Sequence, residues 1–277
     1  MMRSDDPNLA AKEQALFEVI GGYASLGVAF SGGVDSTVLL AAAKKVIGSH
    51  VVALTGCSAI HPAGEKQMAV QMADNLGVRH VLFPSDELTD EKFVTNPPNR
   101  CYLCKQRLFR AMGKEADRLG ISVLAHGVNL DDLSDYRPGN VAADELGIVA
   151  PLVAAGLTKA DIRSLAADWG LENWNRPAMA CLASRIPYDT PISAKTLSCI
   201  DQAETYLRRI GVRQCRVRHH DDLARIETDD DGIAKLAGAQ VRAEVVRAFQ
   251  QIGYRLVCID LEGYQSGKMN RWLNKGR

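Results

Sequence analysis

A short apolar run, a loop with two glycines and a helical segment follow one another near the start of the chain. Residues 27–30 are apolar and predict a buried strand, and residues 37–47, rich in Ala, Leu and Lys, predict a helix. The loop between them reads Ser31-Gly32-Gly33-Val34-Asp35-Ser36. A loop that enters a helix presents unpaired backbone N–H groups and the positive end of the helix dipole, which suits an anion. The stretch therefore predicts a phosphate-binding turn.

The side chains of this loop fit a nucleotide. Gly32 and Gly33 have no Cβ, which allows a sharp turn and a close approach of phosphate oxygens. Ser31 and Ser36 add hydroxyl donors. Asp35 fits beside a polyphosphate if a Mg²⁺ ion bridges them, or it caps the helix. An ordinary strand-to-helix turn capped by Asp35 or Ser36 is the alternative.

The rest of the first two thirds of the chain alternates strands with helices. Apolar runs at 51–54, 78–83 and 122–127 predict strands, and residues 62–76 and the segment from Cys101 to Gly120 predict helices. This order is typical of an α/β fold with a doubly wound parallel sheet, in which ligands bind at the carboxyl ends of the strands.

After Pro191 the pattern changes to helix, two alternating strands, helix and strand. The expected segments are 194–210, 216–219, 224–227, 233–252 and 255–260. They predict a smaller α+β domain. We place the nucleotide-binding domain at 1–188 and a C-terminal domain, for substrate binding or oligomerisation, at 189–277.

Composition limits the classes of function. The 277 residues carry 33 Lys and Arg against 33 Asp and Glu, and this zero net charge argues against a dedicated nucleic-acid partner. The first residues hold no apolar signal segment, and no stretch approaches a membrane span, so we expect a cytoplasmic protein without a membrane partner. Seven cysteines in that compartment are reduced thiols, metal ligands or catalysts rather than a disulfide framework.

Three cysteines are candidates for chemistry. Cys101 and Cys104 are spaced so that both sulfurs can bind one metal, and half of a zinc site, a redox dithiol or two unrelated core thiols remain alternatives. Cys181 lies in a loop of small residues before an arginine and is the best third thiol. Three protein thiolates on a four-iron cluster leave one iron open for an external sulfide. The remaining Cys199, Cys215 and Cys258 lie in or beside predicted elements and are expected in the core.

Several motifs together identify the chain as a member of a known family. The loop at 31–36 resembles the PP-loop of the ATP pyrophosphatases, which cleave ATP to AMP and pyrophosphate. Taken with four further runs, it resembles the LarE family of ATP-dependent sulfur transferases, which build the nickel-pincer nucleotide cofactor of lactate racemase. Those runs are Asp135-Tyr136-Arg137-Pro138-Gly139, the residues from Cys181 to Tyr188, Arg216-Val217-Arg218 and Ser266-Gly267-Lys268-Met269-Asn270.

The resemblance implies a reaction. Its substrate is pyridinium-3,5-biscarboxylic acid mononucleotide, whose carboxylate is adenylylated by ATP and then converted to a thiocarboxylate. Members with only the cysteine that matches Cys181 give up its sulfur once per chain. Members that add the pair matching Cys101 and Cys104 hold a [4Fe-4S] cluster that carries sulfide from a separate source. All three are present here, which favours the cluster variant. The resemblance also implies a homo-oligomer such as a hexamer.

Further roles are carried over from matched positions. Arg216 and Arg218 would bind the substrate phosphate, because a guanidinium pairs well with phosphate oxygens. Lys105 and Arg185 flank the candidate cysteines and would stabilise a thiolate or the departing pyrophosphate. Glu204 and Glu227 would hold a cation near the substrate. The alternative for all six side chains is a solvated or salt-bridged surface.

Two other functions are compatible with the sequence. Some PP-loop tRNA thiolases also use three cluster cysteines, but the zero net charge and the lack of an added RNA-binding domain argue against that reading. An ATP-binding regulatory module without chemistry is the second. Tight, salt-sensitive binding of bulk tRNA would indicate the first, and absence of pyrophosphate release with the pyridinium substrate would indicate the second.

Overall fold

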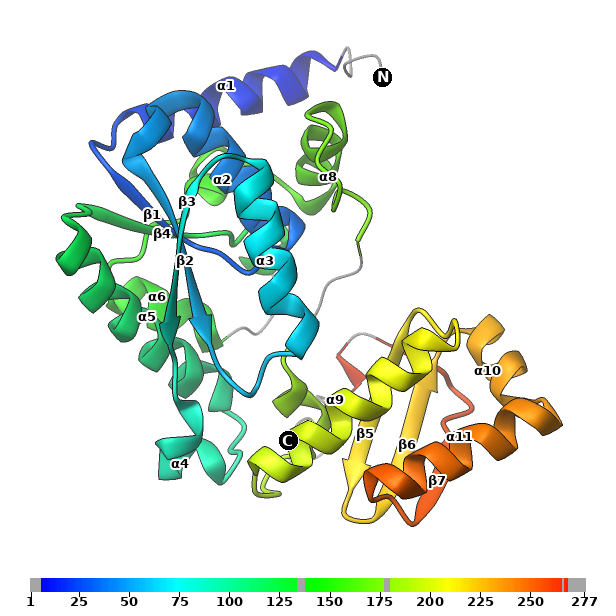
Figure 1. Ribbon diagram of the computed structural model, residues 1–277. Helices are drawn as coiled ribbons and strands as arrows, with labels where there is room; N and C mark the ends of the chain where they lie inside the picture. Colours follow the sequence, from blue (N-terminus) through cyan, green and yellow to red (C-terminus); the bar gives the residue numbers. More distant parts are fainter. Residues whose placement is uncertain (1–5, 134–137, 177–179, 266, 269–277) are drawn as a thin grey trace, which may run out of the picture. The chain divides into compact units, whose positions relative to one another are not determined.

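The computed structural model describes residues 6–133, 138–176, 180–265, 267 and 268, and Figure 1 shows its helices and strands. The chain divides into two compact units. The first holds Met1–Ser58, Ala63–Asp86 and Asn99–Met179, and the second holds Ala59–Pro62, Glu87–Pro98 and Ala180–Arg277. In this division the C-terminal part of the second unit begins at Ala180 rather than at 189, and the unit also includes two short segments from the first half of the sequence.

The first unit is built on a parallel sheet of four strands in the order β3-β2-β1-β4. The strands are β1 (Leu26–Ala29), β2 (Val51–Cys57), β3 (Arg79–Pro84) and β4 (Val123–His126). In register, Leu26 lies opposite Val51 on one side and opposite Val123 on the other. The expected α/β fold with a parallel sheet is confirmed. Because the strand order reverses between β1 and β4, their carboxyl ends form the switch point at which such sheets bind ligands.

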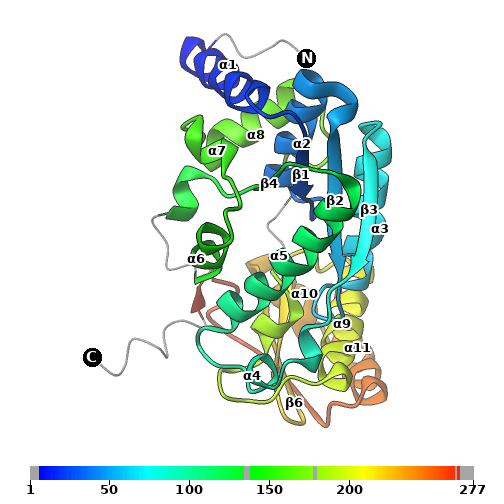
Figure 2. The same cartoon turned by 90° about the vertical axis from the view of Figure 1, so that its left-hand side faces the viewer.

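Helices cover both faces of this sheet (Figures 1 and 2). The helices are α1 (Pro7–Gly21), α2 (Val34–Ile47), α3 (Ala63–Asn75), α5 (Arg100–Leu119), α6 (Pro138–Glu145), α7 (Pro151–Ala154) and α8 (Lys159–Asp168). Right-handed crossovers place α2 and α3 on one face and α5 on the other, since the chain reverses its direction across the sheet after β3. Short 3₁₀ turns lie at Gly48–His50 and Leu130–Leu133. The polar stretch that follows β4 is helical from Pro138 onward, as α6.

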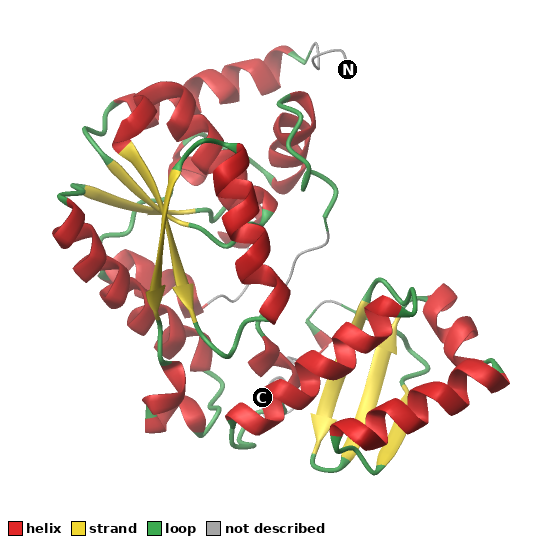
Figure 3. Cartoon of the chain, in the orientation of Figure 1, coloured by secondary structure: helices red, strands yellow, loops and turns green. Residues whose placement is uncertain are grey.

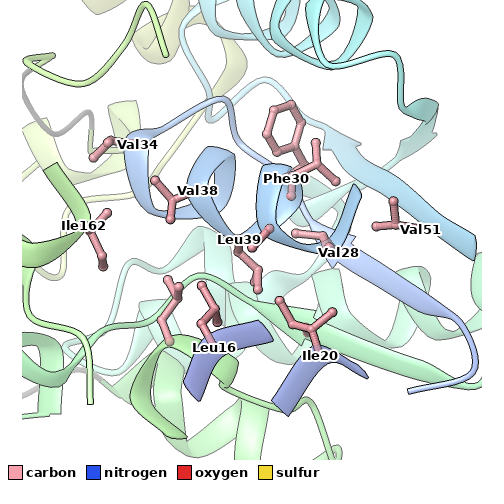
Figure 4. Packing of buried hydrophobic residues seen from close by; sticks show 14 of the residues in the cluster. Leu16, Ile20, Val28, Phe30, Val34, Val38, Leu39, Val51 and Ile162 are labelled. Atoms are coloured by element: carbon pink, nitrogen blue, oxygen red, sulfur yellow. The ribbon is translucent and has the colours of Figure 1, made fainter. Parts of the chain in front are cut away.

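The core of the first unit lies between the sheet and the layer of α1, α2 and α8. Leu16 and Ile20 of α1, Val38 of α2 and Ile162 of α8 are fully buried there, and Figure 4 shows them in one cluster with Val28 of β1. A second cluster packs α5 and α6 against β2 and β3 on the opposite face. The glycine loop between β1 and α2 is thus fixed at both of its ends by buried elements.

The second unit contains a three-stranded sheet in the order β5-β6-β7. Its strands are β5 (Cys215–His220), β6 (Leu223–Thr228) and β7 (Leu256–Ile259), with β5 antiparallel and β7 parallel to β6. Its helices are α4 (Glu91–Val94), α9 (Ala194–Arg209), α10 (Asp230–Ala237) and α11 (Ala239–Ile252), with 3₁₀ turns at Glu87–Thr89 and Leu182–Arg185. Figure 3 shows α9 and α11 crossing the same face of this sheet.

The expected single helix over 233–252 is wrong. Gly238 has an extended backbone, with φ −60° and ψ 134°, and separates α10 from α11. The extended backbone of Gly238 ends the first helix and begins the second. The small domain therefore has two helices between β6 and β7.

Within the part of the chain that the structure describes, no helix combines the length and the hydropathy needed to cross a membrane.

Candidate functional site

The loop after β1 leaves the start of α2 open to an anion. Gly33 is the N-cap of α2, and no side chain among the described residues caps this helix. Gly32 has φ +72°, and a Cβ there would lie 3.2 Å from the backbone Cα of Ala69 in α3. Glycine is therefore required twice over at this position, for its left-handed conformation and for the close approach of α3. The first N–H groups of α2 have no intrahelical acceptor and remain available for phosphate oxygens.

The two serines lie together inside the turn. Their hydroxyl oxygens are 3.3 Å apart, and the Ser36 hydroxyl also donates to the carbonyl oxygen of Gly33 at 3.1 Å. The alternative in which Ser36 or Asp35 caps the helix is wrong, because neither side chain accepts from a first-turn N–H group. Both hydroxyl groups thus lie in the turn that leads into α2.

The carboxylate of Asp35 contacts residues that follow β4 in the chain. One carboxylate oxygen forms an ion pair with the ammonium group of Lys159, and the other accepts from the Asn129 side-chain amide at 3.2 Å. Asn129 follows β4, and Lys159 is the first residue of α8, so neighbouring strand ends and a helix start converge on one carboxylate. A carboxylate with a phosphate site beside it is a suitable ligand for Mg²⁺, which prefers oxygen ligands from carboxylates, phosphates and water.

Two residues of this site were not singled out in the sequence. Lys159 is the first residue of α8, and a capping box of Thr158 and Asp161 begins this helix. Asn173, which is 3% exposed, donates to the carbonyl oxygen of Gly32 at 2.9 Å and to the Thr37 hydroxyl at 2.8 Å. Lys159 and Asn173 both contact residues that are more than a hundred positions away in the sequence, and no local pattern indicates these contacts.

Gly127 fixes the distance between β4 and the glycine loop. A Cβ at this position would lie 2.9 Å from the backbone nitrogen of Ser36 and 3.1 Å from the carbonyl carbon of Asp35. These are backbone atoms of the first turn of α2, which cannot rotate away. The close approach requires a residue without a side chain.

We therefore expect Gly127→Ala to destabilise the chain by about 1–3 kcal/mol, the usual cost of overpacking. ATP binding should weaken as well, since the displaced turn carries the phosphate donors. Gly113→Ala is the control, because a Cβ there meets nothing within 4 Å and alanine favours a helix. Urea unfolding and nucleotide titration measure both effects, and an unfolding free energy equal to that of the control would contradict the argument.

Cys101 and Cys104 lie at the beginning of α5. Residues three apart on a helix share a face, so the two thiols are neighbours on one turn. Cys101 is exposed and Cys104 is half-buried, and neither forms a disulfide. Lys105 follows them, with its ammonium group 5.4 Å from the ring centre of Phe109. Gly139 of α6 packs on this turn, because a Cβ there would lie 2.9 Å from Cγ of Lys105.

His126, the last residue of β4, lies beside the same turn of α5. Its ring makes an edge contact with Phe109 at 5.8 Å between centres. Burial, assisted by the charge of Lys105, lowers the pKa of His126 from 6.5 to about 4. The ring is thus neutral at pH 7 in the folded chain and accepts a proton more readily when the chain unfolds.

This depressed pKa predicts a pH dependence. Between pH 6.5 and 4 the unfolded chain binds the proton and the folded chain does not, so stability falls as the pH is lowered through this range. The slope from this residue is at most about 1.4 kcal/mol per pH unit. The free energy of unfolding should therefore fall more steeply in the wild type than in His126→Gln. Equal slopes of the unfolding free energy against pH in the two proteins, measured by urea titration, would show the expectation to be wrong.

Cys181 lies in the second unit, at the N-terminal side of the 3₁₀ turn Leu182–Arg185. Its thiol is half-buried, and its backbone is held by the next arginine. Arg185 donates from Nη1 to the carbonyl oxygens of Ala180 at 2.6 Å and Cys181 at 2.9 Å, and to the Ser184 hydroxyl at 3.0 Å. Arg185 thus fixes the conformation of the segment that carries the thiol.

Asn96 holds the other end of this segment. Its side-chain amide donates to the carbonyl oxygens of Pro187 at 2.7 Å and Thr190 at 3.1 Å, and its backbone has φ +58°. Asparagine is one of the few residues that tolerate this left-handed conformation. The two prolines that follow Asn96 in the sequence give no indication of these contacts.

Arg185 and Glu204 form a buried pair. Arg185 is 1% exposed and Glu204 is fully buried, with contacts of 2.8 Å from Nε to Oε1 and 3.0 Å from Nη2 to Oε2. Burial alone would raise the pKa of Glu204, but the hydrogen bonds and charge of Arg185 outweigh it and hold this pKa below its usual value. Glu204 also accepts from the backbone N–H of Val217 at 3.1 Å, which ties α9 to β5.

Arg218 and Glu227 form a second buried pair across β5 and β6. Nε and Nη2 of Arg218 lie 2.9 and 2.6 Å from one oxygen of Glu227, and Nη1 donates to the carbonyl oxygen of Ser184 at 2.9 Å. The solvated-surface alternative is wrong for Arg185, Arg218 and both glutamates, because all four are buried. In this structure the cations at the two glutamates are guanidinium groups of the chain itself.

Arg216 lies on the same strand face as Arg218. It is 8% exposed, its Nη1 donates to the carbonyl oxygen of Cys215 at 2.8 Å, and its guanidinium lies 5.0 Å from the ring centre of Tyr264. Burial, followed by the nearby charge of Arg185, lowers the pKa of Arg216. The solvated-surface alternative is wrong here too.

The other four cysteines are one core thiol, Cys215, and three half-buried ones, Cys57, Cys199 and Cys258. Cys215 is 1% exposed, and burial raises its pKa to about 12, so the core prediction is confirmed for it. Cys199 and Cys258 are half-buried. Among the described residues, no group of three or more His, Cys, Asp or Glu side chains is arranged to hold a metal ion.

Comparisons with known proteins identify the family. The asparagine synthase profile matches residues 22–97, the region of the glycine loop. The chain is 40% identical over 267 residues to an uncharacterized protein of Synechocystis, covering 96% of this chain and all of that one. It is 35% identical over 270 residues to pyridinium-3,5-bisthiocarboxylic acid mononucleotide synthase of Lactiplantibacillus plantarum, covering 97% of each chain. The chain belongs to the LarE family. Its likeness to a GMP synthase of Aeropyrum pernix, 28% over 200 residues, covers 65% of this chain and 38% of that one.

The family motifs lie in both units. The glycine loop belongs to the first unit, and Cys181 and the two arginines of β5 belong to the second. In the C-terminal motif, Lys268 forms ion pairs with Asp260 at 2.8 Å and Glu262 at 3.0 Å. The positions of that motif and of the earlier run that lie outside the described residues are Asp135, Tyr136, Arg137, Ser266, Met269 and Asn270.

Proposed function

We propose that this LarE-family enzyme is an ATP-dependent sulfur transferase that acts on pyridinium-3,5-biscarboxylic acid mononucleotide and forms a thiocarboxylate. The observation that carries the proposal is the uncapped glycine loop at the start of α2, in a chain 35% identical over nearly its whole length to a synthase of the bisthiocarboxylic acid mononucleotide. The product would serve the synthesis of the nickel-pincer nucleotide cofactor.

The first half-reaction activates the carboxylate. A substrate oxygen attacks the α-phosphorus of ATP, the bond to the β-phosphate breaks, and pyrophosphate leaves with an acyl-adenylate remaining. The N–H groups at the start of α2 and the hydroxyl groups of Ser31 and Ser36 would hold the phosphates. Gly32 and Gly33 leave room for this approach. The donor set around Asp35, an anionic oxygen beside a phosphate site, fits Mg²⁺, which would neutralise charge on the phosphates.

The second half-reaction transfers sulfur. A sulfur nucleophile attacks the acyl carbon, the bond to AMP breaks, and AMP leaves, because a phosphate monoester is a better leaving group than carboxylate oxygen. Cys181 would supply this sulfur or bind the group that does. Arg185 would act on Cys181 as a positioning residue, through its bonds to the carbonyl oxygens of the segment. Lys105, next to the pair on α5, would stabilise thiolate or pyrophosphate charge.

A [4Fe-4S] cluster on Cys101, Cys104 and Cys181 is the proposed sulfur carrier. The chemistry of the donors fits, since all three are thiols and two share one helical turn of α5. Such a cluster would supply an open iron for an external sulfide, so one chain could act repeatedly. The alternative is that Cys181 donates its own sulfur once per chain, and the tests below distinguish this alternative from the cluster.

The second unit would bind the substrate. Arg216 and Arg218 lie on one strand face, and their guanidinium groups suit the phosphate of a mononucleotide. Glu204 and Glu227 would orient Arg185 and Arg218 through the buried pairs rather than hold a metal alone. We further propose a homo-oligomer, a separate sulfide source, a cytoplasmic location and no nucleic-acid partner.

Iron content tests the cluster. The chain purified without oxygen should be brown and contain about four irons, and Cys101→Ala should lose both the colour and the iron. Cys57→Ala, a half-buried thiol on β2, is the control and should retain them. A colourless wild type with zinc, or a Cys101→Ala chain that still completes its single round of sulfur transfer unchanged, would reject the cluster.

A further inference from the structure

Asp35 has a cation of the chain itself beside it. The ammonium group of Lys159 contacts one carboxylate oxygen directly. The side chains of both residues are partly exposed, at 30% for Lys159 and 22% for Asp35, so solvent and ions reach the pair. The pair is therefore a candidate for a role of its own.

The backbone of Lys159 is fixed while its side chain is not. Its N–H group donates to Asp131 at 2.9 Å, and Thr158 caps α8 through a capping box with Asp161. These contacts set the position of the Lys159 Cα relative to Asp35. Beyond that atom, four methylene groups carry the ammonium and can swing between positions without moving the helix.

We infer that Lys159 is the resident counter-ion of Asp35 in the nucleotide-free chain and competes with divalent cations for that carboxylate. This inference rests on the proposed function, in which Asp35 binds Mg²⁺ together with ATP. An intramolecular ammonium is always present at high effective concentration. Mg²⁺ dehydrates reluctantly and binds well only when phosphates add further oxygen ligands. The lysine would thus prevent the empty site from holding a metal ion and make metal binding depend on nucleotide.

The chain contains a matched control. Lys12 of α1 forms an ion pair with Asp161 of α8 at 2.6 Å, and their side chains are 24% and 19% exposed. Asp161 lies on the same helix as Lys159. Lys12→Met removes the same charge from the same unit and leaves the Asp35 carboxylate untouched. Any effect of net charge alone would therefore appear equally in both variants.

Mn²⁺ titration followed by electron paramagnetic resonance tests the inference on the full chain without nucleotide. Lys159→Met should bind Mn²⁺ about fivefold or more tightly than wild type, because a partly exposed ion pair no longer opposes it. Lys12→Met should bind as wild type does. Adding Asp35→Asn to Lys159→Met should abolish the gain. Equal Mn²⁺ affinity of Lys159→Met and wild type, or a gain that survives the loss of Asp35, overturns the inference.

A second titration separates this inference from the proposed function. If Asp35 binds the metal of the metal–nucleotide complex, Asp35→Asn should bind Mn²⁺ and ATP together more weakly than wild type. Unchanged binding would refute that role of Asp35. Weakened binding in Asp35→Asn, with Lys159→Met still indistinguishable from wild type in the absence of nucleotide, would refute the competition alone. Circular dichroism of each variant checks that the overall helix content of the chain is unchanged.

Discussion

Cys181→Ala should release pyrophosphate in the presence of ATP and the pyridinium substrate but form no thiocarboxylate. The adenylylation step depends on the glycine loop of the first unit, whereas the sulfur step depends on Cys181 in the second. The rate of product formation should fall by about a thousandfold or more, as it does when an enzyme loses its nucleophile. Mass spectrometry of the product and a coupled pyrophosphate assay measure the two steps separately.

The substitution is structurally mild. Cys181 precedes a 3₁₀ turn, and its side chain makes no capping hydrogen bond within the described chain. Cys199→Ala, in the same unit and also half-buried, is the control and should keep both steps. Thiocarboxylate formation by Cys181→Ala at the rate of that control would exclude Cys181 from the sulfur step. Loss of pyrophosphate release as well would mean that the thiol also contributes to activation.

Arg185→Met should destabilise the chain by about 3–5 kcal/mol. The substitution leaves Glu204, which is fully buried, without the guanidinium that binds both of its oxygens, and a buried charge without its partner is costly. It also removes the donors that hold the carbonyl oxygens of Ala180 and Cys181. We therefore expect a lower free energy of unfolding in urea and a slower sulfur step in whatever folded protein remains.

Arg208→Met is the control for this effect. Arg208 contacts the same carboxylate at 3.3 Å, but its side chain is 32% exposed, so its removal should cost less than about 1 kcal/mol. Acid gives a second signature. In the wild type Glu204 has a lowered pKa, and its contribution to stability is present above the unfolded pKa and lost as the pH falls. Without Arg185 the pKa of Glu204 rises, so the deficit of the variant should shrink at acid pH. Equal losses in the two arginine variants at neutral pH would contradict the argument.

Local patterns predicted the elements that carry the glycine loop. The apolar run before Ser31, the Ala- and Leu-rich segment after it and the alternation of strands with helices all operate within short windows, which is where periodicity is informative. The break at Gly238 was missed because the apolar spacing continues through it, and a glycine inside a helical pattern does not by itself end a helix.

Contacts between residues from different elements could not be predicted from the sequence. Asp35 and Lys159 are separated by 124 positions, and nothing near either residue indicates the other. The glutamates were expected either on a solvated face or beside a bound cation. Their burial depends on Arg185 and Arg218, which come from a different element in each case. A charged side chain can be buried only with its partner, and the identity of that partner is a property of the tertiary fold.

The central claim is that ATP activates a carboxylate so that sulfur can replace its oxygen. The most direct test incubates the oxygen-free chain with ATP, Mg²⁺, a sulfide source and pyridinium-3,5-biscarboxylic acid mononucleotide, and follows nucleotide products and substrate mass together. We expect AMP and pyrophosphate to form only with substrate present, in step with a product in which sulfur replaces one oxygen. Formation of ADP and phosphate, or AMP formation that does not depend on the pyridinium substrate, would contradict the claim.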